Sequence, residues 1–470
     1  MGKTPGGIGS ENWSDAWQYT NQAKEGEITF SKDLPKGYYF INYFTRGEYF
    51  EPRERILITI GEDISSISLD KNEFTTKEDI TIHYHEAPGR PKDWIGVYEE
   101  GKVPGVDDLD GFFYTYGGID GNITINAGDL KPGKYFSSLY IDDSWEEVSE
   151  RKNFVVKGAR TDDKTGVTTL YGTWNNEELQ SLDLSNATVL DLRNATISED
   201  FALNETVNPN CLVYITAETV LNSEQPNVVR ISQDGAEAKQ IVLKDQYPFY
   251  NSCPFTAGSV VYNRSALNSS WSSVVLPFAF STNNLSNDIQ VYTYTDIVAD
   301  GESGYLKVKQ AEGELAANQP LLFKSQNPEV QIEATDALIG ITPSDPSTPV
   351  ANSGYTVKGS YKTVESLPVG SLILSQDKFW MVDSENTGIR SFRTYISPAT
   401  TGNQIKTLNI VTEGTTQIED AFHTPAVEKA DIYKLDGVCI KKQANVTESL
   451  KELPAGIYII NGQKVIINKK

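Results

Sequence analysis

Cysteine is nearly absent from this sequence. Its 470 residues include three cysteines, Cys211, Cys253 and Cys439. Three widely separated thiols are too few for a disulfide framework or a thiolate metal site, and at most one bridge could form. So few cysteines fit both a reducing cytosol and a bacterial exported protein that folds without disulfides. Cysteine usage therefore does not decide the compartment.

Long apolar runs are also missing. Apolar runs such as residues 274–276 (VVL) are broken within a few residues, whereas a membrane-spanning helix needs roughly 18. We therefore expect no transmembrane segment. Residues 1–17 contain no apolar stretch either, so they do not read as a signal peptide.

Positive charge is scarce relative to negative charge. The chain has 41 Lys and Arg against 64 Asp and Glu, a formal net charge of −23. An acidic surface repels phosphate backbones, so we expect no nucleic-acid partner. With 39% hydrophobic and 22% charged residues, the composition is that of a globular protein with about three domains of average length.

Histidine is rare, which restricts the catalytic chemistry. His83 and His85 lie at i and i+2, so on a strand both project from one face, where they could share a metal ion or be solvated; His423 has no evident partner. A zinc site wants three or four ligands, and no third is recognisable by spacing. Neither a G-x-S-x-G elbow nor a Gly-rich phosphate loop is present. We assign no catalytic residue and no cofactor, although 64 acidic residues leave a glycosidase carboxylate pair open.

What is present is an internal repeat. Residues 33–40 (DLPKGYYF) match residues 129–136 (DLKPGKYF), and the match continues in one register on both sides. Upstream it ends at the start of the chain, where Gly2 corresponds to Gly101. Three further predicted strands precede that point in the second copy and are missing from the first: residues 66–69, 80–84 and 94–98.

A sandwich without those three strands would expose an open edge and an apolar face. We therefore expect the natural protein to extend upstream, or its start to be displaced. Alternatively, the short copy packs on its neighbour as a half-domain. Under the first expectation, a signal peptide would lie outside this sequence.

Both copies alternate apolar and polar residues, as in residues 134–141 and 153–156, with Gly, Pro, Asn and Asp between the runs. This period of two predicts short antiparallel strands, and six or seven of them in about 95 residues predict an immunoglobulin-like sandwich. Residues 91–98 (PKDWIGVY) and 130–136 (LKPGKYF) resemble SKICH-type sandwiches and the similar modules beside bacterial metallophosphoesterases. That resemblance implies an accessory or interaction domain without catalysis.

The central part of the chain is predicted to be β as well. Residues 183–188 (DLSNAT) recur as 191–196 (DLRNAT) and short strands follow, a pattern of a solenoid-like segment or of two irregular hairpins. From residue 256 longer strands predict one larger sandwich. Its segments 319–322 (QPLL) and 391–395 (SFRTY) resemble a β-module common in surface proteins of Bacteroidetes, which implies no activity.

The last residues form a separate unit behind a linker rich in Thr, Glu and Ala. Residues 432–437 (IYKLDG) and 453–465 (LPAGIYIINGQKV) are similar to the C-terminal sorting domains of the Bacteroidetes type IX secretion route. From Glu428 onward there are 8 lysines against 5 acids, so a basic tail ends an acidic chain. The resemblance implies export to the outer surface or the medium, or a small structural domain.

The sequence thus predicts an all-β protein of tandem modules. The predicted segments are a truncated immunoglobulin-like repeat (1–61), a complete SKICH-like domain (62–158), a solenoid-like segment (165–255), a β-sandwich (256–412) and a sorting-like domain (428–470).

Two groups of residues are candidate binding sites. Asp107, Asp108 and Asp110 are spaced like part of a calcium loop but lack the distal Glu of an EF-hand, so calcium is an alternative to a structural turn. Tyr49 and Trp145 fall in loops at matching positions of the two copies. They are the best candidates for ligand-facing rings, or they anchor their loops by packing.

The combined features favour a secreted or surface-attached, non-catalytic protein for adhesion or for binding a glycan or protein ligand. The alternative from a different class is the C-terminal accessory part of a larger secreted enzyme, a phosphoesterase or protease, with its catalytic domain upstream of residue 1.

Overall fold

The protein is described by a computed structural model that covers residues 18–30, 34–35, 37–43, 56–61, 65–197, 207–219, 225–265, 270–351, 353–398, 405–413, 429–434, 437–454, 456–460 and 463–467. Two compact units divide the chain. Unit 1 comprises Met1–Thr161, Thr168–Asn176 and Leu192–Ser198. Unit 2 comprises Asp162–Val167, Glu177–Asp191 and Glu199–Lys470.

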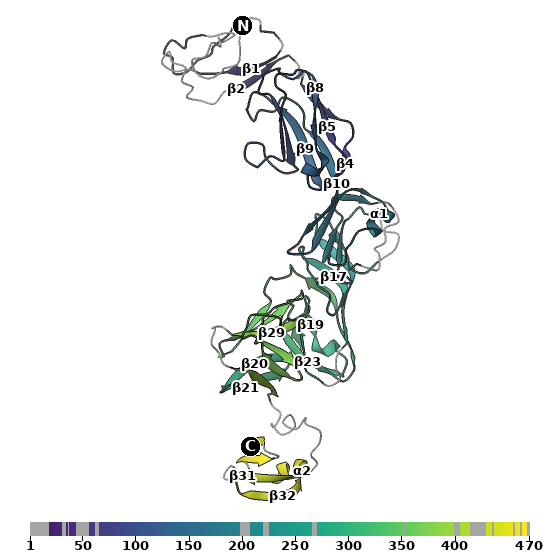
Figure 1. Ribbon diagram of the computed structural model, residues 1–470, viewed down its shortest axis with the longest axis vertical. Coiled ribbons are helices and arrows are strands. Elements are labelled where there is room, and N and C mark those ends of the chain that lie inside the picture. The colour runs from purple at the N-terminus through teal and green to yellow at the C-terminus, as the bar shows by residue number, and fades with distance from the viewer. Residues whose placement is uncertain are drawn as a thin grey trace. The chain divides into compact units, whose positions relative to one another are not determined.

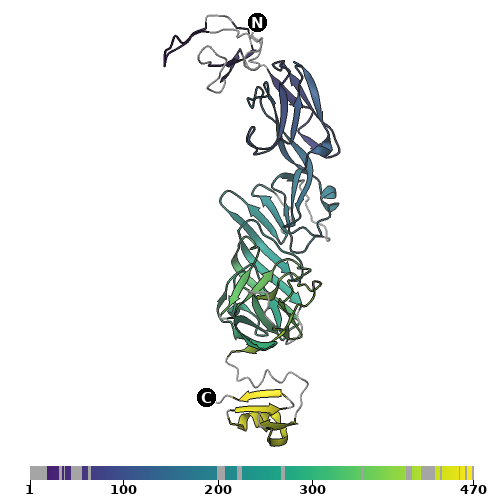
Figure 2. The ribbon, with the colours of Figure 1, turned by 60° about the vertical axis from the view of Figure 1, so that its left-hand side comes forward.

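Strands make up nearly all of the regular structure in both units (Figures 1 and 2). The helical elements among the described residues are α1 (Asn176–Gln180), α2 (Val446–Glu452), η1 (Ala127–Asp129) and η2 (Thr282–Asn284). The all-β prediction is confirmed. None of these helices has the length and apolar character that a membrane crossing requires.

Unit 1 contains a two-layer sandwich. Its strands are β1 (Gly37–Ile41), β2 (Ile56–Ile60), β3 (Ser66–Leu69), β4 (Glu73–Thr75), β5 (Ile80–His85), β6 (Trp94–Glu99), β7 (Gly111–Tyr114), β8 (Gly121–Ile125), β9 (Gly133–Tyr140), β10 (Lys152–Asp162), β11 (Val167–Trp174) and β13 (Ala195–Ile197). One layer has the order β11-β10-β9-β6-β7, and the other has the order β3-β5-β8. The three strands expected before the second repeat copy are confirmed as β3, β5 and β6.

The sandwich has two separate apolar clusters. Between its layers lies the main core, in which Ile80, Ile95 and Leu139 are fully buried. On the opposite face of the β6-β9 pair a second cluster consists of aromatic rings: Trp94, Tyr98, Phe136 and Tyr140. Strand β6 therefore buries side chains on both faces, and its burial pattern is nearly continuous.

The strands among the described residues of the first repeat copy are the antiparallel pair β1-β2. Tyr38 joins it to the second copy, because its hydroxyl donates to the carbonyl of Val148 at 3.1 Å and accepts from the amide of Ser65 at 3.3 Å. Arg90 Nη2 also donates to the Tyr38 carbonyl at 3.1 Å. These contacts belong to unit 1 alone.

A tyrosine corner accompanies each copy of the repeat. The hydroxyl of Tyr39 donates to the carbonyl of Pro35, and that of Tyr135 donates to the carbonyl of Lys131, both at 2.8 Å. In the C-terminal part of the chain Tyr458 makes the same contact with Pro454 at 2.9 Å. All three lie in an L-x-x-G-x-Y sequence, so the shared letters encode one local structure that fixes the start of a strand.

Unit 2 is built on further β layers. Its strands are β12 (Val189–Asp191), β14 (Leu212–Thr216), β15 (Val228–Ile231), β16 (Ala236–Lys244), β17 (Phe255–Ser265), β18 (Ser272–Val274), β19 (Phe280–Ser281), β20 (Ile289–Asp300), β21 (Ser303–Gln310), β22 (Glu314–Leu315), β23 (Leu321–Ser325), β24 (Glu329–Ile339), β25 (Ser347–Val350), β26 (Tyr355–Ser360), β27 (Leu372–Ser375), β28 (Lys378–Met381), β29 (Arg393–Pro398), β30 (Thr407–Thr412), β31 (Lys429–Lys434), β32 (Cys439–Asn445), β33 (Gly456–Ile460) and β34 (Gln463–Ile467). A ten-stranded sheet has the order β18-β23-β20-β21-β30-β28-β27-β29-β26-β25.

The predicted solenoid-like segment contains stacked parallel strands. Strand β12 pairs parallel with β14, and β14 pairs parallel with β15. Buried asparagines hold the stack: Asn210 Nδ2 donates to the carbonyl of Lys244 at 2.8 Å, and Asn227 exchanges two bonds with the backbone of Val242. These amides satisfy backbone groups that would otherwise be buried without partners.

The C-terminal strands form a small sheet of order β32-β31-β33-β34 with helix α2. Ile432, Leu450 and Ile460 are buried in a core of their own. Asn445 caps α2 by accepting from the amide of Glu448 at 3.1 Å. None of the three cysteines is in a disulfide, and burial raises the pKa of the Cys211 thiol to about 12.

Candidate functional site

Trp145, a predicted ligand-facing residue, lies in the segment after β9 and is half exposed at 52%. Its ring meets that of Trp94 edge to face, with 5.3 Å between centroids. Gly105 lies against the same indole, because a Cβ there would be 3.0 Å from the ring. Trp145 therefore both packs on its loop and offers ring surface to solvent. The other predicted residue, Tyr49, lies outside the described residues.

Through Trp94, Trp145 is connected to a series of aromatic ring contacts that follows β7. Trp94 contacts Phe112 with ring centroids 4.9 Å apart, Phe112 contacts Tyr114 at 4.7 Å, and Tyr114 contacts Tyr116 at 5.8 Å. Phe112 is 41% exposed and Tyr116 is 83% exposed. We call Trp145, Trp94, Phe112, Tyr114 and Tyr116 the aromatic row.

Strand alternation creates this row. Phe112 and Tyr114 point to one side of β7, whereas Phe113 between them packs against the main core. On β6, Gly96 leaves room for the rings, since a Cβ there would be 2.7 Å from Trp94 and 2.9 Å from Tyr140. Strand β7 is the last strand of its sheet, so the row lies at an open edge.

A shallow cavity of about 410 Å³ lies at this edge. Its lining comes from β7 and from β8 of the other layer: Phe112, Phe113, Tyr114, Tyr116, Ile123 and Thr124. The lining therefore combines aromatic rings with the hydroxyl groups of Tyr114, Tyr116 and Thr124.

Charged side chains flank the row at Tyr114. The hydroxyl of Tyr114 donates to Asp143 Oδ1 at 2.7 Å, and Lys92 forms an ion pair with the same carboxylate. The hydrogen bond from Lys92, followed by that from Tyr114, holds the pKa of Asp143 below its usual range. The same contact with Asp143 raises the pKa values of Lys92 and Tyr114. Hydrogen-bond donors and acceptors held in fixed positions therefore lie beside the aromatic row at Tyr114.

Asp93 supports these flanking groups from inside. It is fully buried, and its two carboxylate oxygens accept from the amides of Arg90 at 2.7 Å and Asp142 at 3.1 Å. Burial raises the pKa of Asp93 to about 6, although the two amide hydrogen bonds act in the opposite direction. The Asp93 carbonyl accepts from the amide of Thr115 at 2.8 Å, which ties the end of β7 to the same residue.

The three predicted calcium ligands have other partners or point elsewhere. Asp110 forms an ion pair with Lys102, with 2.8 Å between Oδ2 and Nζ, and its carboxylate accepts a hydrogen bond from the amide of Glu99 at 2.7 Å. Asp107 accepts from the amide of Val103 at 2.7 Å, while Asp108 contributes its backbone carbonyl to Lys102 at 3.1 Å. Nowhere in the described residues do three or more His, Cys, Asp or Glu side chains gather as a metal ion requires.

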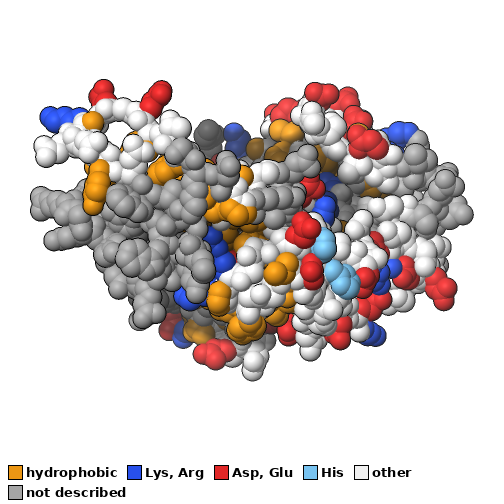
Figure 3. All heavy atoms as spheres, turned by 90° about the horizontal axis from the view of Figure 1, so that it is seen from above, with side chains coloured by type: hydrophobic (Ala, Val, Ile, Leu, Met, Phe, Trp, Pro, Cys, Tyr) orange, Lys and Arg blue, Asp and Glu red, His pale blue; other side chains and the backbone are white. Residues whose placement is uncertain are grey.

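The two strand histidines have acidic neighbours. His83 Nε2 lies 2.9 Å from Asp70, and His85 Nδ1 contacts Asp120. Figure 3 shows the histidine side chains beside carboxylates on the surface. Each histidine pairs with its own aspartate, so the shared-metal alternative has no third ligand among the described side chains. His423 lies outside the described residues.

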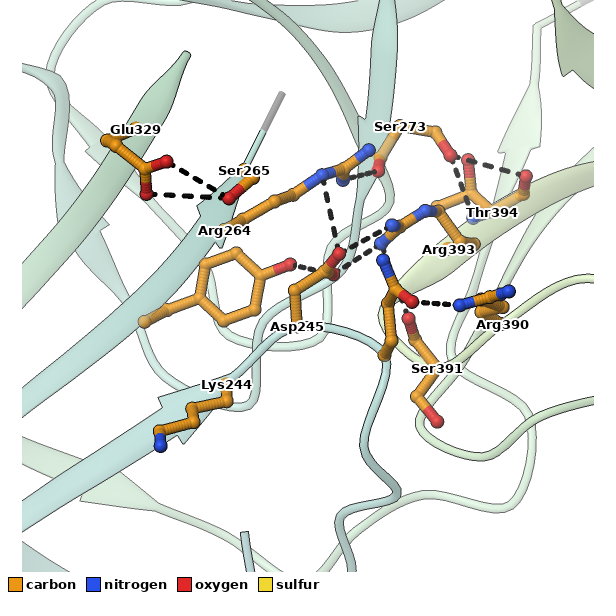
Figure 4. Close-up of polar contacts among 12 residues, drawn as sticks. Lys244, Asp245, Arg264, Ser265, Ser273, Glu329, Arg390, Ser391, Arg393 and Thr394 are labelled. Carbon is orange, nitrogen blue, oxygen red and sulfur yellow. Dashed lines mark hydrogen bonds and ion pairs between the residues drawn. The ribbon is translucent and has the colours of Figure 1, made fainter. Parts of the chain in front are cut away.

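The densest buried charge cluster is in unit 2. Figure 4 shows Arg264 and Arg393 converging on Asp245. Arg393 Nη2 donates to Asp245 Oδ2 at 2.6 Å, Arg264 Nε lies 3.8 Å from the same oxygen, and the hydroxyl of Tyr262 donates to Oδ1 at 2.6 Å. Burial disfavours the charged form, but Arg393 and then Arg264 hold the pKa of Asp245 below its usual range.

This cluster joins three segments of unit 2, because Arg264 is on β17, Arg393 begins β29 and Asp245 follows β16. Arg264 is 8% exposed and donates to the carbonyl of Ser273 at 2.7 Å. Its groups are directed at one another within the interior. We therefore assign it a structural role rather than a role in ligand binding.

Sequence reasoning found part of the site and missed the rest. Trp145 was identifiable from the sequence as an exposed-ring candidate, whereas Phe112, Tyr114 and Tyr116 were not. The adjacent residues Asp142 and Asp143 look alike in the sequence, but the side chain of Asp142 is 14% exposed and lies 3.6 Å from Arg90, whereas that of Asp143 is 38% exposed. The buried role of Asp93 had no sequence signal, because its partners are backbone amides.

No protein-family model and no curated protein matches this chain. Among solved structures, a Paenibacillus cycloisomaltooligosaccharide glucanotransferase complexed with cycloisomaltoheptaose aligns at 8% identity over 59% of this chain and 72% of that chain, with a TM-score of 0.14. A mutant Salmonella alpha-2-macroglobulin aligns at 8% identity over 79% of this chain and 23% of that chain, with a TM-score of 0.16. The methylamine-reacted form of that macroglobulin gives 7% identity and a TM-score of 0.15 over the same shares. Likenesses at these TM-scores say nothing about the fold or activity of this chain.

Proposed function

We propose that this chain is a secreted or surface-attached, non-catalytic protein that binds a glycan through the aromatic row of unit 1. The observation that carries the proposal is the continuous line of ring contacts from Trp145 to Tyr116 at an open sheet edge. Exposed aromatic rings give contact area at low entropic cost.

A glycan suits this surface better than a protein for two reasons. Sugar rings have flat C–H faces that pack on aromatic faces, and their hydroxyls need directional partners at the rim. Lys92, Asp143 and the Tyr114 hydroxyl form such a rim, already joined to one another by hydrogen bonds. The carboxylate of Asp143 lies at this rim, and the whole chain has a net charge of −23, which favours a neutral glycan over an anionic one.

Export is a separate part of the proposal. It is supported by the resemblance of residues 428–470 to type IX sorting domains, and by the resemblance of residues 62–158 to SKICH-like interaction modules. The expected outcome is that residues 428–470, fused to a reporter, direct it to the surface or medium of a Bacteroidetes host with that route. A reporter that stays in the cell would contradict this part alone.

The binding proposal is tested with the full chain on an array of neutral glycans, followed by calorimetry on the glycans that bind. Trp145→Ala and Tyr116→Ala are each expected to weaken affinity about tenfold or more, since aromatic anchors dominate such contacts. Tyr247→Ala is the matched control, because Tyr247 is similarly exposed at 46% but lies in unit 2.

Tyr116→Ala is expected to fold like the wild type, because Tyr116 is 83% exposed. A loss of affinity in this variant is therefore not caused by misfolding. Unchanged affinity in both variants would overturn the proposal. So would an array on which no neutral glycan binds while a protein ligand is captured through Trp145.

A further inference from the structure

The outer face of the ten-stranded sheet in unit 2 carries two adjacent rows of side chains. In the first row, direct cross-strand pairs run from Ser303 on β21 through Thr407, Trp380, Ile373 and Tyr395 to Lys358 on β26. In the second row, Tyr305 pairs with Asn409, which pairs with Lys378. The rows are two residues apart along each strand, so they share one face.

This face points away from the core. On the same strands the alternate residues, such as Leu306, Phe379 and Ile396, are fully buried. By contrast Tyr305 is 45% exposed and Trp380 is 42% exposed. Trp380 is held in place, because its Nε1 donates to the carbonyl of Ser375 at 2.9 Å.

The three aromatic residues lie on alternate strands of the sheet, with Trp380 and Tyr395 in the first row and Tyr305 in the second row. Tyr305 is on β21, Trp380 on β28 and Tyr395 on β29, and one strand separates each from the next in the order β21-β30-β28-β27-β29. Two strand spacings are about 9.5 Å, close to the length of a disaccharide unit in an extended polysaccharide. Between the rings lie Thr407 and Asn409, whose side chains can bond hydroxyls.

The charges on this face are mixed, because Asp300 of β20 pairs directly with Ser303 at the end of the first row, while Lys378 lies close to Trp380. Lys378 lies two residues before Trp380 on the same face, and its side chain has no hydrogen bond or ion pair within the described part of the chain. The other nearby lysines are neutralised, Lys358 by Asp345 and Lys307 by Asp296, each at 2.9 Å. Asp377, beside Lys378, is engaged by the amide of Trp271 at 2.6 Å. A free ammonium group beside Trp380, and across β30 from Tyr305, complements a carboxylate.

We propose that this face of unit 2 binds an acidic polysaccharide, with sugar rings on Tyr305, Trp380 and Tyr395 and a uronate carboxylate at Lys378. It is a second site, independent of the aromatic row of unit 1, and it prefers an acidic ligand where that row prefers a neutral one. Two such sites on one chain would let it bridge neutral and acidic glycans.

The test is affinity electrophoresis of the full chain in gels containing polygalacturonate, with an uncharged glucan in parallel gels. We expect retardation by polygalacturonate that falls about tenfold or more in Trp380→Ala and severalfold in Lys378→Gln. Binding should weaken with added salt in the wild type, and less so in Lys378→Gln.

Three control variants locate the site. Tyr305→Ala removes an exposed ring and leaves the hydrogen bond from Trp380 to Ser375 in place. It therefore tests the same site if Trp380→Ala fails to fold. Tyr247→Ala should bind like the wild type, as should Trp145→Ala, whose ring belongs to unit 1. The proposal is overturned if polygalacturonate does not retard the wild type, if Trp380→Ala and Tyr305→Ala are both retarded by it as strongly as the wild type, or if Trp145→Ala is the variant that loses binding.

Discussion

The indole of Trp145 stands edge-on to the indole of Trp94, with an interplanar angle of 89° and 5.3 Å between ring centroids. Trp94 in turn stacks on Tyr140 at 4.2 Å and donates from Nε1 to the carbonyl of Ser144 at 3.2 Å. A half-exposed ring is therefore seated on a fully buried one. Because its rotamer is already restricted, binding a ligand there costs little further side-chain entropy.

A side chain at Gly96 should disrupt the rings that pack beneath the aromatic row. A Cβ there would lie 2.7 Å from the Trp94 ring, so Gly96→Ala must displace the rings. We expect a loss of about 1 to 3 kcal/mol in unfolding free energy together with a loss of glycan affinity. Urea unfolding followed by tryptophan fluorescence measures the first effect, and calorimetry measures the second.

Gly128→Ala is the control, because the nearest atom to a Cβ there is 3.5 Å away. That variant should stay within about 0.5 kcal/mol of the wild type, as a surface substitution does. Equal stability of the two variants would show that the rings under the row are loosely packed.

Asp93 should make the stability of unit 1 depend on pH. Its pKa in the folded protein is about 6, above the usual value near 3.9, so the folded state holds this proton more tightly than the unfolded state. Protonation of Asp93 therefore stabilises the fold at low pH, and this contribution is lost as pH rises from about 4 through about 6.

Asp93→Asn removes that titration. Relative to the wild type, the variant should gain stability as pH rises over the same interval, by up to about 1.4 kcal/mol per pH unit. Urea unfolding of both proteins at pH 4, 5, 6 and 7 checks this trend, with pH values chosen to bracket the folded pKa of about 6. A difference between the two proteins that does not change with pH would contradict it.

Asp245 should be essential for the stability of unit 2. Asp245→Asn leaves Arg264 and Arg393 facing each other in the interior without a counter-charge, and we expect a loss of about 3 to 5 kcal/mol. Because the folded pKa of Asp245 is lowered, its stabilising contribution is present above pH 4 and is lost as pH falls through the folded pKa.

Asp296→Asn is the matched control for charge, since its ion pair with Lys307 is partly exposed. It should cost at most about 1 kcal/mol. Thermal unfolding of the two variants compares them directly, and similar midpoints would refute a structural role for the buried cluster.

The all-β class, the positions of most strands and the exposed-ring candidate Trp145 were determined by the sequence alone. They depend on local properties: alternation with a period of two, Gly and Pro at turns, and the L-x-x-G-x-Y motif that forms a tyrosine corner wherever it occurs. Local backbone preferences act over a few residues, so the sequence is enough to reveal them.

Tertiary structure alone decided which distant residues meet. Lys92 and Asp143 are 51 positions apart, and Asp245 and Arg393 are 148 apart. The spacing of Tyr305, Trp380 and Tyr395 exists because β21, β28 and β29 alternate with β30 and β27 in the sheet, an order that differs from their order in the chain. Strand order is set by the burial of whole faces in a shared core, and no short stretch of sequence contains that information.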